Sequence, residues 1–543
     1  MGDTEIQSPP LPSRIATLVH SHFDGLPKRS KPVIRDDGTA EWIPMTGIVL
    51  VKGENTLVET LTCITVATGA KCLPTSRIPQ CKGLVLHDCH AEILAMRAFN
   101  HWLLSECYSV LAQTRHSSKD GNDEENKILS PFIRRRQIDI KRGAEPPFEI
   151  QPDVRIYMYC TCAPCGDASM ELCMAAQDDP TPWAIPAPDE ESDNTSGANL
   201  DTSTTSTTQL LTGRGHFSRL GIVRRKPARA DAESTKSKSC SDKIALRQVS
   251  SLLNYETSLF VAPTENAYIT ALILPEEEIT RVGCARCFGE DGRMKGLKGK
   301  VWPVQGAGGT GADGRTEIWY RYEFRPFRIL SIPTEQLTSL WPFRKPRSSD
   351  GEAERQDLEG SQSGPAAPKK SKPSNLSTIW IRAPTMTRPV ETEGGPSAVM
   401  IADTGAKSLP TLRGSTTGLF EHIMNGVKQG NKVSSPGLRG ASALSRAKSW
   451  SYCQEILGSI SQPPEESVSL IEGDAEARVK ACPSVLQAST YREFKAPGNL
   501  TETMRARKGA IQNAREILDG WVPNSGDEDW GLDVLVDSKK RKR

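Results

Sequence analysis

The sequence predicts an α/β fold, a layered core of strands and helices that is interrupted by long polar segments. Short apolar runs alternate along the chain with longer stretches of helical periodicity, and this alternation is typical of a sheet covered by helices. The hydrophobic content is only 37% of 543 residues, and stretches rich in Asp, Ser, Thr and Pro separate the apolar ones. Only part of the chain is therefore expected to form a core.

The predicted order of elements begins with paired strands within residues 13–107. Val49–Val51 and Leu61–Ala67 are short apolar runs, and Gly53 and Asn55 lie in the segment between them. Apolar runs bounded by turn-forming residues are typical of neighbouring strands. We therefore expect a strand pair here.

Helices and strands are then predicted to alternate. Ala91–Leu104 carries apolar residues at helical spacing, so we expect a helix that begins near Asp88–His90. Arg155–Tyr159 is predicted to be a strand that runs into a Cys-rich turn. Further along, Asp242–Leu253 is predicted to be a helix and Tyr268–Leu274 a strand.

The polar segments predict one large domain with insertions. Residues 110–150, 178–212 and 345–376 are polar or of low complexity, and we expect them to be disordered. The domain is predicted to span residues 13–535, with a basic tail at 536–543. Because the formal net charge is only +2, any surface that binds nucleic acid has to be local.

Cysteine usage and hydropathy indicate a soluble intracellular protein. The 14 cysteines show no disulfide-framework spacing, and no apolar run approaches the ~18 residues that a membrane span needs. Clustered cysteines in such a chain suggest a metal site or catalysis. The basic end Lys539–Arg543 is either a nuclear-import signal or a solvated tail, so we expect a nuclear or cytoplasmic location.

The segment from His87 to Glu92 carries the first sign of a catalytic metal. A His-x-Glu at a helix start, here His90 and Glu92, places an imidazole beside a carboxylate. The imidazole can hold a metal ion, while a carboxylate that is not a ligand can move the proton of an activated water. The motif is short and occurs by chance in many chains. His87 is expected to be structural.

A second part of the predicted metal site lies at Pro164-Cys165-Gly166. A thiolate at a helix N-terminus suits a metal ligand, because the helix dipole lowers the thiol pKa. The nucleobase-deaminase signature Pro-Cys-x-x-Cys is incomplete here, since Ala168 occupies the second cysteine position. A third ligand has to come from elsewhere. Cys240 is the best candidate, because Ser239–Asp242 also opens a predicted helix.

Two structural explanations of the cysteines remain open. The cysteines around Cys165 also fit small buried side chains on a strand and a helix. Alternatively, two pairs with the spacing Cys-x-x-Cys would form a four-cysteine structural zinc site, consisting of Cys162, Cys165, Cys284 and Cys287. The proline and glycine beside Cys165, with His90 and Glu92 upstream, match deaminase chemistry better.

Nine short segments, in order along nearly the whole chain, carry a family resemblance. They are Phe23–Pro27, Thr68–Cys72, His87–Glu92, Pro164–Asp167, Arg225–Pro227, Ser239–Lys243, Ser445–Lys448, Tyr491–Lys495 and Gly520–Val522. In these segments the chain resembles the adenosine deaminases that act on RNA, and most closely the eukaryotic tRNA-specific branch. The resemblance implies a cytidine-deaminase-like core, a mixed sheet flanked by helices, enlarged into one RNA adenosine deaminase domain.

The resemblance also implies a reaction and its residues. It assigns one zinc ion to the ligands His90, Cys165 and Cys240, and the proton shuttle to Glu92. The reaction is the hydrolytic deamination of adenosine to inosine, in which water activated by zinc attacks the purine C6 and ammonia leaves. Thr68 is expected, by resemblance, to touch the target nucleotide.

The family buries an inositol hexakisphosphate as a structural cofactor, which needs a dense cage of basic and polar aromatic side chains. The matching positions are Arg97, Lys243, Lys448, Tyr491, Lys495 and Trp521. Two basic contacts of relatives are replaced here by Met96 and Leu246, and Arg247 is expected to substitute for one of them. Asp88 and Lys226 match the relay that joins this cofactor to the zinc centre.

The implied substrate is tRNA, with the adenosine 3′ of the alanine anticodon as its target. Catalytic-type sequence starts near Ser13, which leaves no room before it for the duplex-binding domains of double-stranded RNA editing enzymes. An anticodon loop also presents unpaired bases, as the chemistry requires. The basic residues expected to contact phosphate are Arg134, Arg135, Arg136, Arg224, Arg225 and Arg229.

Three other functions remain open at this point. The chain would edit double-stranded RNA, deaminate free nucleosides or cytosine, or serve as a non-catalytic RNA-binding module with structural zinc. The large size and the remote Cys240 disfavour the second function, and an intact Glu92 disfavours the third, since a structural zinc site needs no such carboxylate. No membrane association and no obligate protein partner are expected.

Overall fold

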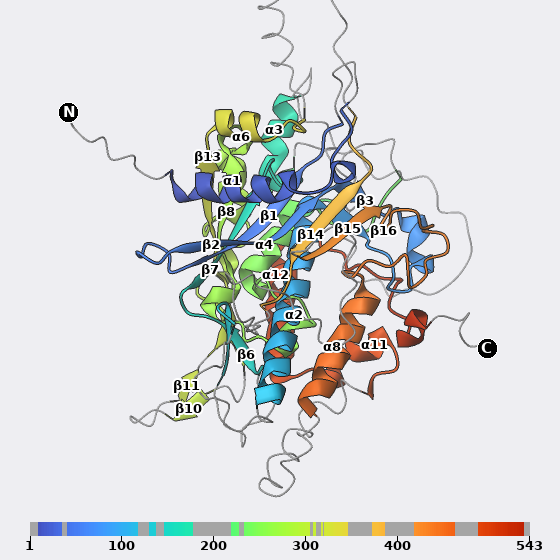
Figure 1. The fold of residues 1–543 in the computed structure, drawn as a ribbon. Coiled ribbons are helices and arrows are strands. Elements are labelled where there is room, and N and C mark those ends of the chain that lie inside the picture. Colours follow the sequence, from blue (N-terminus) through green and yellow to red (C-terminus); the bar gives the residue numbers. More distant parts are fainter. Residues whose placement is uncertain are drawn as a thin grey trace, which may run out of the picture.

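The computed structural model of the protein describes twelve segments of the chain, which form one body around a central sheet (Figure 1). They comprise residues 9–34, 41–117, 130–136, 146–176, 219–226, 233–304, 308–310, 316–318, 320–345, 372–385, 418–461 and 487–536. Within them, none of the helices combines the length and apolar character that crossing a bilayer requires.

The central sheet is mixed and has eight strands in the order β13-β8-β7-β1-β2-β14-β15-β16. They are β1 (Met45–Lys52), β2 (Thr60–Thr68), β7 (Val154–Cys160), β8 (Ile269–Pro275), β13 (Arg328–Ile332), β14 (Ser377–Arg382), β15 (Gly418–Met424) and β16 (Val427–Lys428). The neighbours of β8 are parallel to it, and the other neighbours are antiparallel. Four short pairs lie outside the sheet: β3 (Ala70–Cys72) with β4 (Asp88–His90), β5 (Ile133–Arg135) with β6 (Phe148–Ile150), β9 (Val301–Pro303) with β12 (Arg321–Glu323), and β10 (Gly308–Thr310) with β11 (Thr316–Ile318).

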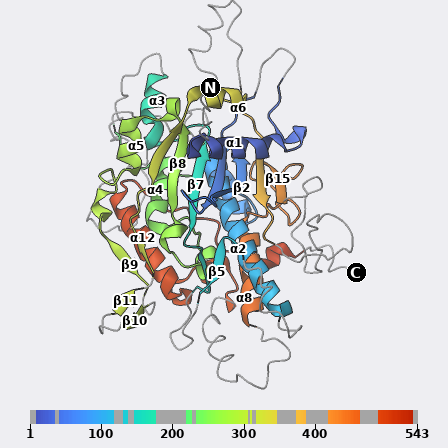
Figure 2. The same cartoon turned by 60° about the vertical axis from the view of Figure 1, so that its left-hand side comes forward.

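The helices cover both faces of this sheet and extend the molecule on one side of it (Figure 2). They are α1 (Leu11–Asp24), α2 (Ala91–Ser117), α3 (Met170–Ala175), α4 (Cys240–Ser250), α5 (Arg281–Phe288), α6 (Thr334–Leu340), α8 (Arg446–Ser461), α11 (Tyr491–Phe494) and α12 (Glu502–Ile517). α2 runs beside α8, and α4 runs beside α12.

Alternation along the strands explains why both faces of the sheet are buried. On β1, Ile48 and Leu50 belong to the larger core, under α2, whereas Val49 and Val51 belong to the smaller core, under α1 and α6. Successive side chains of a strand point to opposite faces, so an uninterrupted apolar run fits a strand that is covered on both sides. The sheet therefore positions α2, whose first turn carries Glu92, against its larger core.

The predicted α/β class and the core elements are confirmed. The two apolar runs are β1 and β2, which pair antiparallel, and the predicted helix near residue 91 is α2. The later strand, helix and strand predictions correspond to β7, α4 and β8.

The expected insertion at residues 110–150 is wrong at its ends. α2 continues to Ser117 because its apolar spacing persists, with Val110 and Leu111 buried in the core. Residues 133–135 and 148–150 form β5 and β6, which pair with each other. Most of the other two expected insertions, at 178–212 and 345–376, lies outside the described residues, as does the basic tail after residue 536.

Candidate active site and metal centre

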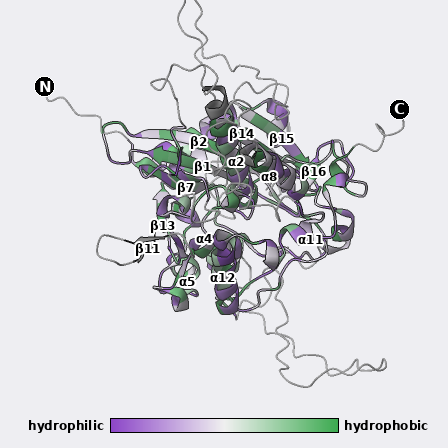
Figure 3. Cartoon of the chain, turned by 90° about the horizontal axis from the view of Figure 1, so that it is seen from below, coloured by the Kyte–Doolittle hydropathy of each residue, from purple (hydrophilic) through white to green (hydrophobic). Residues whose placement is uncertain are grey.

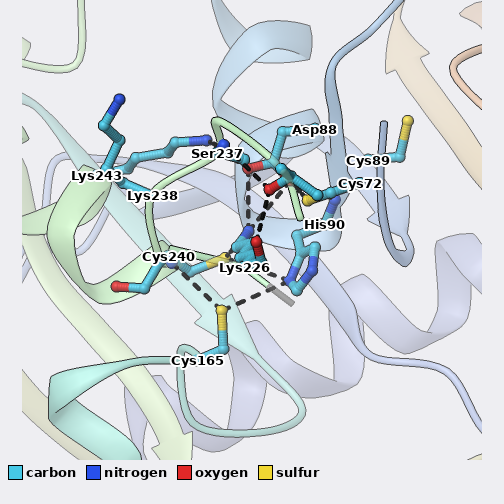
Figure 4. Close-up of polar contacts among 12 residues, drawn as sticks. Cys72, Asp88, Cys89, His90, Cys165, Lys226, Ser237, Lys238, Cys240 and Lys243 are labelled. Atoms are coloured by element: carbon cyan, nitrogen blue, oxygen red, sulfur yellow. Dashed lines mark hydrogen bonds and ion pairs between the residues drawn. The ribbon is translucent and has the colours of Figure 1, made fainter. Parts of the chain in front are cut away.

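Three predicted ligands converge at one point from three distant parts of the chain (Figure 4). His90 ends β4, Cys165 lies in the loop after β7, and Cys240 is the first residue of α4. The His90 Nδ1 atom is 3.7 Å from Cys165 Sγ and 3.5 Å from Cys240 Sγ. All three ligand atoms lie within 4.8 Å of one another, which is the arrangement that a tetrahedral metal ion requires of three of its ligands.

Local backbone geometry explains how the two cysteines meet. Gly166 has a φ of 110°, and a Cβ at this position would lie 2.2 Å from Ser239 Oγ. Only glycine allows so close an approach in this conformation. Ser239 caps α4, since its hydroxyl accepts a hydrogen bond from the backbone N–H of Asp242 at 3.1 Å. The cap and the glycine together place Cys165 against the N-terminus of α4.

The helix end also supplies charge stabilisation for the thiolate. The backbone N–H of Cys240 donates to Cys165 Sγ at 3.4 Å, and the N–H of Ser241 donates to the Cys165 carbonyl at 3.0 Å. A hydrogen bond from the Cys240 thiol, with the charges of Lys226 and His90, lowers the pKa of Cys165 well below its usual value despite burial. A thiolate is the form that binds a metal.

Glu92 sits beside this cluster but is not part of it. It lies in the first turn of α2, its side chain is buried, and none of the described residues hydrogen-bonds its Oε2 atom. Burial, followed by the negative charge of Cys165, raises the pKa of Glu92. An unpaired carboxyl with a raised pKa is suited to take up and release a proton.

Asp88 connects the candidate metal cluster to two lysines. Lys226 Nζ donates to Asp88 Oδ2 at 3.0 Å and to Cys240 Sγ at 3.2 Å, and Lys243 forms a short ion pair with the same carboxylate. Ser237 Oγ donates to Asp88 Oδ2 at 2.6 Å. Burial alone would raise the pKa of Asp88, but the Lys226 and Lys243 ammonium groups outweigh it and hold that pKa well below its usual range.

A second cluster, here called the basic cluster, consists of Arg97, Arg247 and Arg507, which are half-buried, and Lys495, which protein surrounds but which remains exposed to solvent. Burial, with repulsion among these cations, lowers the pKa of Arg247 to about 9. Burial also lowers the pKa of Lys495 to about 8, and it lowers the pKa of Arg97 and Arg507. Glu256 is the carboxylate that interacts with all four cations.

Several donors around the basic cluster are left without partners among the described residues. Arg507 Nε, Ser445 Oγ and Trp450 Nε1 are buried and unsatisfied. Excess buried positive charge and orphaned donors are both costly unless an anion compensates them. The cluster therefore fits a bound polyanion. Figure 3 shows much of α4 and α12, which carry two of its residues, as hydrophilic.

Only part of the predicted cofactor set lies in this cluster. Arg97, Arg247 and Lys495 belong to the cluster, and Tyr491 borders it. The Lys495 ammonium lies 4.5 Å from the ring centroid of Tyr491, and the Tyr491 hydroxyl donates to Glu256 Oε1 at 3.0 Å. Met96 is buried in the larger hydrophobic core, and Leu246 packs against that core.

The other predicted cofactor residues have different surroundings. Lys243 pairs with Asp88, as described above. Trp521 packs against Arg515 and Lys238, with centroid distances of 5.3 and 5.7 Å. Lys448 Nζ donates to the Ala441 carbonyl at 2.8 Å, and burial, with the nearby Lys428, lowers its pKa to about 8.

Two of the residues predicted to contact RNA are buried in the structure. Thr68 is buried, and its hydroxyl accepts a hydrogen bond from the Thr378 backbone N–H at 3.0 Å, so it serves the β2–β14 junction. Arg224 is fully buried, where a phosphate cannot reach it. Arg134 and Arg136 both pair with Glu149, which offsets part of the positive charge of these two arginines. Arg229 lies outside the described residues.

The alternative four-cysteine zinc site is not formed. None of the three His/Cys/Asp/Glu groups close enough to hold a metal in the described part of the chain contains Cys284 or Cys287. One of these groups is Cys81, His87 and Asp527, in which His87 Nε2 lies 3.0 Å from Asp527 Oδ2. Asp527 also pairs with Arg446, which makes a cation there unfavourable.

Sequence reasoning missed Arg507, Glu256, Trp450 and Ser445. Arg507 is one of several basic residues on α12, and its neighbour Arg505 is exposed. Periodicity alone offered a signal, because Arg507 lies on the helix face that also carries Met504 and Ala510, both buried. No local pattern marks Glu256 as the partner of cations from other elements.

Comparison with known proteins agrees with this geometry. Residues 65–287 match the family model of the adenosine-deaminase (editase) domain. The chain is 35% identical over 285 residues to a Schizosaccharomyces pombe protein named tRNA-specific adenosine deaminase 1, which covers 52% of this chain and 62% of the relative. It is 32% identical over 270 residues to the Saccharomyces cerevisiae protein of that name, covering 49% of this chain and 60% of the relative.

A third relative belongs to another branch. The chain is 36% identical over 124 residues to a Mus musculus protein named double-stranded RNA-specific editase B2, covering 23% of this chain and 14% of the relative. The matches to the two fungal relatives thus span about three fifths of their lengths. His90, Glu92, Cys165 and Cys240 all fall within the residues that match the family model.

Proposed function

Residues 65–287 match the family model of the adenosine-deaminase (editase) domain, and on this basis we propose that the chain is a zinc-dependent deaminase that converts adenosine to inosine in tRNA. The observation that carries the proposal is the convergence of His90, Cys165 and Cys240 beside a carboxyl group, Glu92, that is not a ligand. We propose that this catalytic domain extends over residues 13–535.

The donor set fits zinc. One imidazole and two cysteine sulfurs, one of them poised as a thiolate, are ligands that zinc prefers, and three protein ligands leave a position open for water. A zinc ion at this point would lower the pKa of its bound water toward neutrality.

The chain's own residues would move the protons. Glu92 Oε2, buried and without a partner in the described residues, would take the proton of the attacking water and pass it to the purine. Its raised pKa makes the Glu92 carboxylate a stronger base, able to accept this proton and then to release it. Asp88 and Lys226 would hold Cys240 and the His90 backbone in place, since Asp88 Oδ1 accepts from the His90 N–H at 3.0 Å.

The basic cluster favours the binding of a structural polyanion, and we propose that this polyanion is inositol hexakisphosphate. Four cations gathered in one place, three of them half-buried, with one carboxylate and several orphaned donors, match a compact ligand with many phosphate groups. Arg97, Arg247 and Lys495 from the predicted set, with Tyr491 and the newly found Arg507, would hold it. Lys243, which pairs with Asp88, would join this region to the metal site.

The substrate proposal rests on the relatives. Both fungal proteins are named as tRNA-specific, whereas the mouse relative is named for double-stranded RNA and matches over a shorter segment. We propose alanine tRNA, at the adenosine 3′ of the anticodon, as the target.

The test is incubation of the purified protein with unmodified alanine tRNA and, separately, with a duplex RNA, followed by mapping of inosine by sequencing. Inosine only beside the anticodon is the expected result. Inosine only in the duplex would replace the substrate with double-stranded RNA and keep the reaction. Inosine in neither RNA, with zinc bound and the fold intact, would overturn the proposed function.

A further inference from the structure

A small cavity of about 230 Å³ opens directly beside the metal site. Its wall includes Cys72, whose Sγ lies 3.3 Å from Asp88 Oδ1 and within 4.8 Å of a ring nitrogen of His90. Cys89, the residue before His90, also lines it. The β3–β4 pair therefore contributes residues to both the cavity and the metal site, and Figure 4 shows Cys72 beside Asp88 and His90.

The cavity combines an apolar floor with a basic rim. Leu73, Pro74 and Val433 form the floor, and Leu73 and Val433 belong to a small separate hydrophobic cluster. Lys71 and Arg77 stand at the rim, and no acidic residue lines the cavity. Glu233 is a nearby carboxylate outside the lining: it accepts a hydrogen bond from the Ser76 backbone N–H at 3.2 Å, and hydrogen bonding to Ser76, with a smaller effect of the Arg77 charge, lowers its pKa.

This combination fits one nucleotide. Its volume is below the ~300–1,000 Å³ of sites for drug-sized molecules, so it suits a single base rather than a longer ligand. An unpaired base is held by apolar contact and by stacking on planes such as an arginine guanidinium, and its phosphates are held by lysine and arginine. The amide of Asn425, exposed at the rim, can hydrogen-bond a base edge.

We propose that this cavity binds the nucleotide adjacent to the reacting adenosine in the substrate RNA. The inference rests on the proposed function and adds a subsite to it. The cavity shares a wall with the metal site, so a chain that places an adenosine there brings its neighbour to the cavity. The Arg77 and Lys71 side chains then contact the phosphates that flank this neighbour.

The experiment uses the full chain and three forms of alanine tRNA. One form is intact, and each of the other two lacks the base on one side of the target adenosine. Val433→Phe fills the cavity, and Arg77→Ala removes one charge at its rim. Arg321→Ala is the matched control, because Arg321 is an exposed arginine on β12. The partner strand of β12, β9, lies across the molecule from β15, the strand next to the cavity (Figure 2). Zinc content and Tm establish that each variant is folded.

On intact tRNA, kcat/KM falls about 5- to 150-fold for Val433→Phe, the range expected for loss of one stacked base, and is unchanged for Arg321→Ala. One of the base-deleted tRNAs is a poorer substrate for the wild type, and Val433→Phe causes no further loss on it. Arg77→Ala weakens the salt dependence of kcat/KM.

Two results overturn the inference while the proposed function stands: unchanged kcat/KM for both cavity variants, or an equal loss on all three tRNAs. If the wild type itself makes no inosine in intact tRNA, the proposed function is overturned, and this inference with it. These outcomes are distinguishable, because the wild-type measurement comes before any variant is tested.

Discussion

At the scale of single residues, buried titratable groups divide into those with partners and those without. Glu106 and Glu92 are both buried on α2, and burial raises the pKa of both. Glu106 accepts hydrogen bonds from Ser130 and from the Thr385 backbone, which is a structural arrangement. Glu92 leaves one oxygen free beside the metal ligands, and this difference marks it for proton transfer.

Glu92→Gln is therefore expected to lower the rate of inosine formation by about 10²- to 10⁴-fold while zinc binding and Tm are retained. The amide keeps the shape of the side chain but cannot accept and return a proton. Single-turnover inosine formation and zinc per chain are the measurements. Glu106→Gln, the same change on the same helix, should leave the rate per folded molecule unaltered. Persistent activity in Glu92→Gln would show that another group moves the proton.

Buried histidines make the stability of the fold dependent on pH. Burial lowers the pKa of His20 and of His101 to about 4, and none of the described residues hydrogen-bonds the His101 ring. Between pH 6.5 and 4 the unfolded chain binds a proton at each of these residues that the folded chain does not. The free energy of unfolding therefore falls as pH falls through this window.

For one histidine this dependence amounts to at most about 1.4 kcal/mol per pH unit. His101→Gln is expected to reduce the slope of unfolding free energy against pH between 6.5 and 4, as measured by urea denaturation. His422, which is only partly buried, gives the comparison: His422→Gln should change the slope less. An unchanged slope for His101→Gln would mean that His101 titrates alike in the folded and unfolded chains, so that burial does not lower its pKa.

At the scale of elements, the site depends on a glycine turn meeting a helix end. Gly166→Ala places a Cβ 2.2 Å from Ser239 Oγ in a backbone conformation that side chains rarely adopt. We expect it to destabilise the fold by about 1–3 kcal/mol and to weaken zinc binding, measured by thermal unfolding and by zinc titration. Gly458→Ala, on α8 with open space around it, should be neutral or stabilising. Equal zinc affinity in the two variants would contradict this account.

Elements with strong local patterns were predictable, and contacts between distant elements were not. The apolar runs of β1 and β2 and the periodicity of α2 are local properties, so they identified the layers of the core. Cys240 was found because a helix start is also local. The burial of Thr68 and Arg224 was not predictable, because burial of a polar side chain depends on strands and loops that pack on it from elsewhere.

At the scale of the whole molecule, the basic cluster brings together residues from four elements. Arg97 comes from α2, Arg247 from α4, Lys495 from the end of α11 and Arg507 from α12. These cations repel one another, and this repulsion contributes to the lowered pKa of Arg247 and of Lys495. A polyanion among them would turn this repulsion into a link between the helix under the sheet and the C-terminal helices.

The purified protein is accordingly expected to release about one inositol hexakisphosphate per chain on denaturation, measured by mass spectrometry of the extract. A ligand held at ~1,000 times its Kd stabilises a fold by about 4 kcal/mol, so loss of a contact should be visible as a lower Tm. Arg507→Met should reduce both the ligand content and Tm. Arg505→Met, two residues away on the exposed face of the same helix, should change neither, because its side chain pairs with Glu502 at the surface. If the purified protein contains no inositol hexakisphosphate and Arg507→Met leaves Tm unchanged, the four helices hold together without an anion. The proposed cofactor would then be wrong.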